Sequence, residues 1–194
     1  MKKGISLYYM VIVALMAALT CVLGPLAIPL PFSPVPISLT QIPIFLAVYL
    51  LGWKYGTLSY VIYYLLGLVG LPVFSGGAGG MAKAAGPTGG YLLGFILMAI
   101  VAGLFIEKSK GKKGYCVIGM VLGDACAYLF GTPWLCYQMN LTLPQGFAAG
   151  VFPYLPGDAV KIIACAIIGP VLKKALDHVM MEHGQIHLIT QPGS

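Results

Sequence analysis

The chain has 194 residues, of which 59% are hydrophobic and 8% are charged, and its mean hydropathy is +0.93. A soluble domain carries roughly 25% charged residues, so this composition cannot cover a water-facing surface. The net charge of +6 does not indicate nucleic-acid binding, because the basic residues are all lysines and most of them flank hydrophobic segments. We therefore expect an integral membrane protein.

Hydropathy predicts an all-α fold, a six-transmembrane-helix bundle in which residues 1–194 form a single membrane domain. Each helix needs roughly 20 residues to cross the hydrocarbon. The first segment follows Lys2 and Lys3 but lacks a small-residue cleavage site, so we interpret it as a span and not as a signal peptide. Pro43 is expected to interrupt the second span, and Asp124 lies in the middle of the fifth. The predicted spans are residues 7–23, 38–53, 56–70, 90–106, 114–132 and 157–176.

The lysines predict the orientation of the chain. Cytoplasmic segments of membrane proteins carry an excess of positive residues. With the N-terminus inside, all lysines except Lys83 and Lys161 fall in cytoplasmic segments, and both termini are cytoplasmic. These lysines are Lys2, Lys3, Lys54, Lys108, Lys110, Lys112, Lys113, Lys173 and Lys174.

The same assignment places three loops rich in Pro and Gly on the outer side, at residues 24–37, 71–89 and 133–156. Irregular backbone near membrane depth is tolerated where it is buried in protein or lines a cavity. Because the three loops converge on one side, we expect a ligand pocket there.

Asp158 and Lys161 introduce opposite charges at the start of the last span, three residues apart and therefore on one helix face. Charges within a membrane helix are costly and usually face a cavity or the bundle interior. We predict that both line the ligand site. The alternatives are a structural ion pair, or a Lys161 side chain that reaches the headgroups.

Residues 70–91 form a glycine-rich loop between the third and fourth spans. Glycine allows the backbone to approach a ligand closely, and Phe74 and Tyr91 would supply flat apolar walls. Close helix packing by small residues is the alternative explanation.

The sequence does not support nucleotide binding, enzymatic catalysis or metal binding. Gly111-Lys112 lacks the upstream glycine of a phosphate-binding loop, since Ile106 stands at that position. No motif for an activated nucleophile is present, so we do not expect an enzyme. His183 and His187 have no third ligand nearby in the sequence, so we expect neither a metal site nor a cofactor.

Ala14 and Ala18 place two small residues on one face of the first span. Small residues four apart allow another helix to come close, either within the chain or from a partner.

Two motifs together resemble the BioY family, the biotin-specific S components of energy-coupling factor (ECF) transporters. The first is Gly86-Pro87-Thr88-Gly89-Gly90-Tyr91 with the preceding glycine loop, and the second is Pro153-Tyr154-x-Pro156-Gly157-Asp158-x-x-Lys161. The resemblance covers nearly the whole chain. Asp124 belongs to neither motif.

The resemblance implies a subunit of a prokaryotic plasma-membrane importer that captures biotin outside. Its implied partners are a transmembrane T subunit, reached through Ala14 and Ala18, and two cytoplasmic ATPases. Lys161 can pair with the biotin carboxylate while Asp158 or Gln41 accepts from the ureido N–H groups, or Asp158 and Lys161 can pair with each other; the sequence leaves open which charge meets which end of the ligand. A stand-alone secondary carrier for biotin or a small carboxylate is the alternative. The predicted substrate-binding residues are Gln41, Phe74, Gly86, Thr88, Gly89, Gly90, Tyr91, Asp158 and Lys161.

Overall fold

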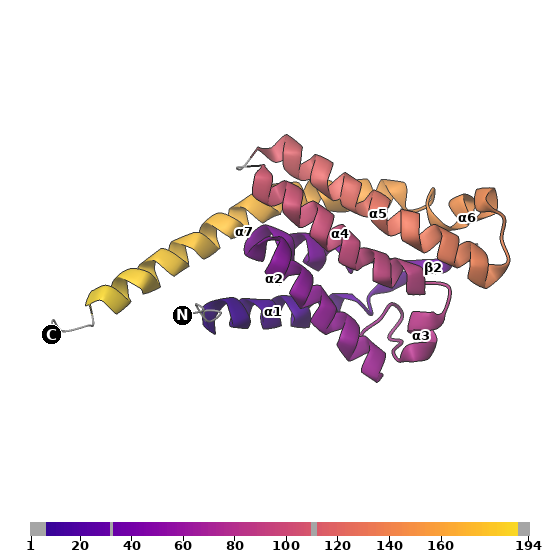
Figure 1. Cartoon of the computed structure of the whole chain (residues 1–194), viewed down its shortest axis with the longest axis horizontal. Helices are drawn as coiled ribbons and strands as arrows, with labels where there is room; N and C mark the ends of the chain where they lie inside the picture. The colour runs from indigo at the N-terminus through magenta and orange to yellow at the C-terminus, as the bar shows by residue number, and fades with distance from the viewer. Residues whose placement is uncertain (1–6, 32, 110–111, 190–194) are drawn as a thin grey trace.

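The computed structural model describes residues 7–31, 33–109 and 112–189, without the side chains of residue 180 and residues 182–189. Lys2, Lys3 and Lys110, and the side chains of His183 and His187, therefore lie outside the described part. Figure 1 shows a bundle of helices with a small β-hairpin at one end. Its elements are α1 (Leu7–Leu23), β1 (Ala27–Leu30), β2 (Ser33–Ser38), α2 (Gln41–Val69), α3 (Met81–Ala85), α4 (Gly89–Lys108), α5 (Lys113–Met139), α6 (Leu143–Gly150) and α7 (Leu155–Ile189).

The helical character of the predicted fold is confirmed. Helices α2, α4, α5 and α7 are long and apolar enough to cross a membrane, and α1 is a shorter apolar helix. The prediction that every element is helical is wrong, because the first outer loop contains an antiparallel hairpin that pairs Ala27 with Ser38 and Ile28 with Ile37. Its prolines fit this structure, since each strand of a two-stranded sheet keeps one edge that needs no hydrogen bond.

The second and third predicted spans form one element, α2, that breaks at Gly52. Gly52 has φ 76°, a conformation that glycine adopts without steric cost. The polar groups beside the break are bonded by side chains of other helices: Trp53 N donates to Glu107 Oε1 at 3.0 Å, and Lys173 Nζ donates to Leu50 O at 3.1 Å. The chain therefore breaks its helix here without leaving these groups unpaired.

Pro43 does not interrupt the second span, contrary to the prediction. The helix begins at Gln41, so Pro43 lies in its first turn, where a missing N–H costs no intrahelical hydrogen bond.

The predicted outer loop 133–156 is also largely helical. Helix α5 continues through Pro133 to Met139 and ends at Asn140, whose positive φ caps it. After it, Thr142 and Gln145 form a capping box that starts α6. Helix α7 extends past the predicted end of the last span and projects beyond the bundle in Figure 1.

Glycines bring α4 and α5 close together. A Cβ built at Gly94 would lie 2.9 Å from the Cα of Ala127, and one at Gly123 would lie 2.9 Å from the carbonyl oxygen of Met98. Backbones at this distance leave no room for a side chain, which is the packing that small residues permit between membrane helices. The pair α4/α5 thus forms a rigid wall beside the site.

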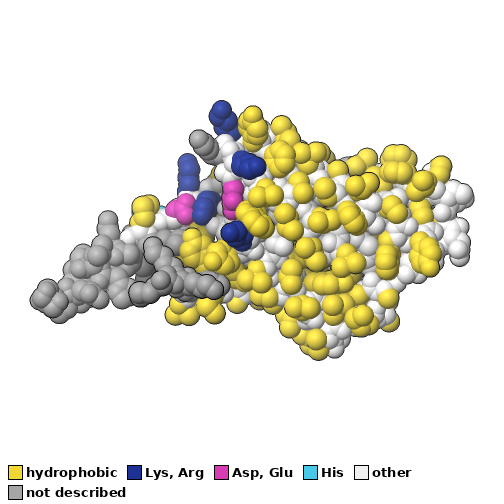
Figure 2. Space-filling model, in the orientation of Figure 1, with side chains coloured by type: hydrophobic (Ala, Val, Ile, Leu, Met, Phe, Trp, Pro, Cys, Tyr) yellow, Lys and Arg dark blue, Asp and Glu magenta, His cyan; other side chains and the backbone are white. Residues whose placement is uncertain are grey.

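The described lysines predicted to be cytoplasmic gather at one end of the bundle, where α4 ends, α5 begins and α2 breaks. Figure 2 shows lysine side chains concentrated in this region, whereas hydrophobic side chains cover most of the remaining visible face. The beginning of α1 and the end of α7 lie toward the same end in Figure 1.

Replacing Gly52 with alanine is expected to destabilise the fold by about 1–3 kcal/mol, because a non-glycine residue is strained at this φ. The new Cβ would also lie 2.2 Å from Glu107 Oε1. Gly114→Ala is the matched control, since a Cβ there meets nothing within 4 Å. The thermal unfolding midpoint of each variant in detergent measures the effect, and equal midpoints would contradict the role assigned to Gly52.

Candidate functional site

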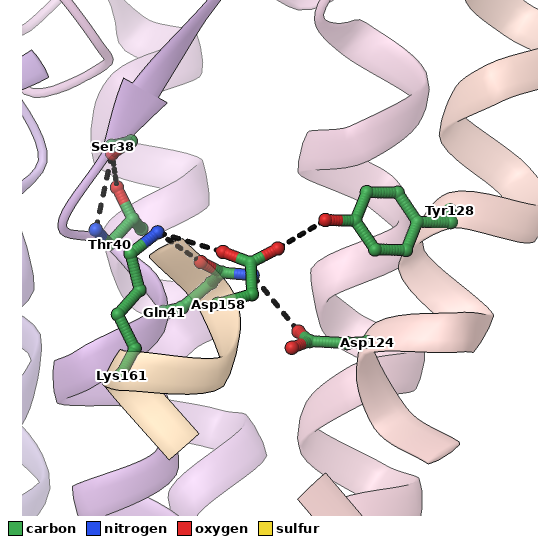
Figure 3. A network of polar contacts seen from close by, with 7 residues as sticks. All are labelled: Ser38, Thr40, Gln41, Asp124, Tyr128, Asp158 and Lys161. Carbon is green, nitrogen blue, oxygen red and sulfur yellow. Dashed lines mark hydrogen bonds and ion pairs between the residues drawn. The ribbon is translucent and has the colours of Figure 1, made fainter. Parts of the chain in front are cut away.

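A network of buried polar side chains joins α2, α5 and α7 (Figure 3). Lys161 Nζ donates to Gln41 Oε1 at 2.5 Å and to Asp158 Oδ1 at 3.0 Å. Gln41 Nε2 in turn donates to Asp124 Oδ1 at 2.9 Å, and Tyr128 donates to Asp158 Oδ2. Gln41 therefore connects the Lys161–Asp158 pair of α7 with Asp124 of α5.

The positions along each helix explain how these groups meet. Gln41 is the first residue of α2, and Asp158 lies in the first turn of α7 with Lys161 one turn later. Asp124 and Tyr128 are four residues apart on α5 and so share a face. The predicted common face of Asp158 and Lys161 is confirmed by their ion pair.

The network is buried: Gln41, Asp124, Asp158 and Lys161 are each at most 8% exposed. Buried charges are tolerated when they are paired and hydrogen-bonded. One atom departs from this rule, because Asp124 Oδ2 has no hydrogen-bond partner among the described residues. This side chain, which the sequence motifs left unassigned, presents a free acceptor at the site.

A cavity of about 60 Å³ adjoins the network. Its walls come from β2, from Tyr91 and Phe95 of α4, and from the turn before α7. The four network residues Gln41, Asp124, Asp158 and Lys161 all line it. The site thus combines a charged end with aromatic and aliphatic walls, which is the usual design of a small-molecule pocket.

A second cavity of about 50 Å³ shares Val35, Pro36, Ser38, Tyr91 and Phe95 with the first. Its remaining lining is rich in hydroxyl groups. Thr88 precedes α4 without capping it, and its buried hydroxyl has no hydrogen-bond partner in the described part. The two cavities therefore form neighbouring compartments with different chemistry. The residues specific to the second are Thr40, Tyr63, Ser75, Thr88 and Leu92.

The hairpin forms a wall common to both compartments. Tyr154, which precedes α7, donates a hydrogen bond to the carbonyl of Val35, and Ser33 Oγ donates to Ala149 O at 2.7 Å. Tyr91 donates to Gly150 O at 3.0 Å from the opposite side. A few hydrogen bonds at the outer rim thus hold the hairpin and α6 against the helices.

Other predicted site residues in the glycine loop have different surroundings. Phe74 is fully buried but lines neither cavity; its ring packs against Gly67 and lies 5.7 Å from the ring of Tyr63. It therefore fastens the loop to α2. Lys83 of α3, in the same loop, is partly buried, and this burial lowers the pKa of its ammonium.

Gly86, Gly89 and Gly90 likewise do not line either cavity. The carbonyl of Gly86 accepts a hydrogen bond from Trp134 Nε1 at 2.9 Å, and a Cβ at Gly90 would lie 2.3 Å from Trp134 Cβ. Gly89 is equally crowded by Ala84. These glycines allow the loop and α5 to approach closely, and they thereby position Thr88 and Tyr91 at the cavities.

The face of α1 that carries Ala14 and Ala18 is exposed, while Ile12, Val13 and Met16 on the other side pack into the bundle. The two alanines are therefore not used for close packing within the described part of the chain. They lie on an apolar surface available to another helix.

Sequence reasoning missed Asp124, Tyr128 and Tyr154 as site residues. A signal existed for the first two, because an acidic residue in mid-span with a tyrosine four positions later indicates a polar helix face. Tyr154 stood inside a quoted motif without a role. Among the described side chains, no group of three His, Cys, Asp or Glu residues is placed to hold a metal ion.

The apolar helices and the enclosed polar pocket define a membrane protein with a small-molecule binding site. Among known protein families, residues 1–178 match the BioY family. The chain belongs to the BioY family.

Individual BioY proteins match this chain over most of their length. The biotin transporter BioY of Thermotoga maritima is 41% identical over 147 residues, which cover 76% of this chain and 86% of that protein. The biotin transporter BioY of Lactococcus lactis subsp. cremoris is 36% identical over 167 residues, covering 83% and 88%. A crystal structure of the S-component for biotin from an ECF-type ABC transporter superposes with a TM-score of 0.82 at 34% identity, covering 90% of this chain and 95% of that one.

Proposed function

We propose that this chain is the substrate-binding S component of an ECF-type importer and that it captures biotin on the outer side of a prokaryotic plasma membrane. Membership of the BioY family, together with a pocket lined by buried polar side chains, supports the assignment. The chain binds and releases the vitamin, and ATP hydrolysis takes place on partner ATPases.

The two ends of biotin occupy different compartments of the site. Biotin has a ureido head with two N–H donors, an apolar thioether ring and a carboxylate tail. The charged compartment holds two carboxyl groups and one ammonium, and Asp124 Oδ2 is an acceptor without a donor. A ureido head satisfies this acceptor, whereas a third carboxylate would be repelled.

The second compartment suits the carboxylate. Thr88 offers an unpaired hydroxyl there, and it immediately precedes the N-terminus of α4, which carries partial positive charge. This orientation differs from a pairing of Lys161 with the carboxylate, which the sequence left as one of the possibilities. Lys161 instead holds Gln41 and Asp158 in position to accept from the ureido group.

Entry of the ligand requires the shared wall to move. The cavities of about 60 and 50 Å³ are smaller than typical ligand pockets of roughly 300–1,000 Å³. The hairpin is the element best placed to move outward, because only a few hydrogen bonds and a small apolar cluster around Val35 hold it against the helices and α6.

The chain crosses the membrane six times with both termini in the cytoplasm. A Cβ at Gly56 would lie 2.7 Å from the Cα of Val48, although eight residues of continuous helix would separate them by about 12 Å. The chain therefore reverses at Gly52. Residues 41–51 span only about 16 Å, and β2 completes the second crossing, which brings Gln41 to mid-depth.

The transmembrane T subunit docks on the exposed Ala14/Ala18 face of α1, and two ATPases bind through it. This face lies on α1, none of whose residues lines either ligand cavity. Energy coupling and ligand capture are thus assigned to separate surfaces.

Lys161→Ala and Asp158→Asn are each expected to weaken biotin binding at least tenfold, because loss of one partner of a buried charge pair costs about 2–5 kcal/mol. Lys174→Ala and Asp177→Asn make the same chemical changes at the far end of α7 and should leave affinity unchanged. Isothermal titration of the purified chain measures the effect. Unchanged affinity in both site variants would leave the pair a purely structural one.

The orientation of biotin is tested by comparing it with biotinamide, whose tail is neutral. Thr88→Val should weaken biotin binding about tenfold, through loss of a hydrogen bond to a charged group, with little effect on biotinamide. Asp124→Asn should weaken both ligands equally. If Lys161→Ala instead were the variant that distinguished the two ligands, the carboxylate would lie at Lys161.

Replacing Ala14 and Ala18 together with tryptophan should block docking sterically while the distant pocket stays intact. We expect normal biotin binding by the isolated chain, but loss of co-purification with the T subunit and ATPases and loss of ATP-driven uptake. Ile163→Trp with Ile167→Trp is the matched control, since these residues are exposed on α7 at the same spacing. Lost binding together with an intact complex would reverse the assignment, and transport by the chain alone would favour a secondary carrier.

A further inference from the structure

A cavity much larger than the two at the ligand site lies at the opposite end of the described part of the chain. It measures about 540 Å³ and opens between the start of α1, the break in α2, the α4–α5 turn and the middle of α7. We call it the lysine-lined cavity, because Lys113, Lys173 and Lys174 contribute to its wall.

The charge of this cavity is unbalanced. Its acidic lining residue, Glu107, already accepts a hydrogen bond from Trp53 N. Lys173 is occupied by Asp177 at 3.1 Å and by the carbonyl of Leu50. Lys113 and Lys174 form no ion pair with any described residue. Two ammonium groups at the cavity are thus available for an anion.

The rest of the wall is apolar. Val48, Leu51 and Ile106 contribute aliphatic surface, and Pro170 contributes the surface of α7. Tyr49 is 7% exposed, and its hydroxyl has no nitrogen or oxygen partner within the described ranges. An apolar pocket with free ammonium groups at its rim and a buried unpaired hydroxyl fits an amphiphile better than a free ion.

The position of the cavity indicates that this amphiphile is a membrane lipid. Lys113 begins α5, and Lys174 lies near the end of the apolar part of α7, Leu155–Val179. These positions correspond to the depth of the lipid headgroups, and basic pockets between membrane-spanning helices bind anionic headgroups. An acidic segment of a partner protein would match the charge but would not require the apolar interior. We propose that the lysine-lined cavity binds one anionic phospholipid, with its phosphate at Lys113 and Lys174 and an acyl chain along the apolar wall.

Such a lipid would bridge elements that the protein itself joins weakly. The break in α2 is held there by single hydrogen bonds from Trp53 and Lys173. A phosphate between α5 and α7 adds a contact across the same gap, so bound lipid should stabilise this end of the bundle without touching the ligand site.

The test uses the full-length chain in detergent micelles with equal amounts of phosphatidylglycerol and phosphatidylcholine that carry the same acyl chains. Native mass spectrometry counts the lipid retained. We expect one phosphatidylglycerol to be retained at least about fivefold more often than phosphatidylcholine. Lys113→Ala with Lys174→Ala should abolish the preference, and added phosphatidylglycerol should raise the thermal midpoint of the wild type but not of this variant.

Lys108→Ala with Lys112→Ala is the matched control, because it removes the same charge from exposed residues outside the cavity wall. An equal loss of the preference for phosphatidylglycerol in both double variants, or no such preference in the wild type, would overturn the proposal.

Displacement of the lipid by inorganic phosphate would identify a free-anion site instead. Protection of Lys113 and Lys174 from amine acylation only in the assembled transporter would identify a protein-docking surface. Biotin binding should persist in both variants, which separates this test from that of the proposed function.

Discussion

The structure depends on one requirement: a lysine ammonium buried within a bundle of apolar helices must be paired with a carboxylate and hydrogen-bonded. Lys161 meets it through Asp158 on its own helix and Gln41 on α2. Gln41 then bonds Asp124 of α5 with its other end. Since unpaired charge inside a membrane protein is costly, the three helices are held together at one depth. The same requirement therefore fixes the fold and assembles the binding site.

The shortness of the first segment of α2, residues 41–51 before the break at Gly52, follows from this arrangement. Gln41 has to reach Lys161 in the interior, so the helix begins there and the preceding chain continues as a β-hairpin. The exposed polar backbone of a hairpin is acceptable at this depth because it lines a cavity and is bonded by Tyr154 and Ser33. Strand β2 can therefore supply an apolar wall of the pocket, because the chain before Gln41 forms a hairpin and not a continuation of the helix.

The two ends of the molecule carry different chemistry for different purposes. The end that holds the ligand cavities combines acceptors, hydroxyl groups and aromatic walls, which suit the neutral ureido head and anionic tail that we propose for the ligand. The other end concentrates lysines around a larger cavity beside the break at Gly52. Helices α4 and α5 run from one end to the other and pack closely through glycines. The surfaces that we propose for ligand capture, partner docking and lipid contact are separate, which is why substitutions at each can distinguish them.

The sequence by itself determined the membrane environment, because 59% hydrophobic residues and 8% charged residues leave no other solvent. It also determined the family and the common face of Asp158 and Lys161, since residues three apart on a helix are always neighbours. Tertiary structure decided the remaining features. Asp124 became a site residue only because Gln41, distant in sequence, bonds it, and the site glycines proved to pack against Trp134 and Ala84. Loop 24–37 folded as a hairpin because two neighbouring proline-containing segments pair with each other, and the five prolines of this loop hide the usual sequence signal of a strand.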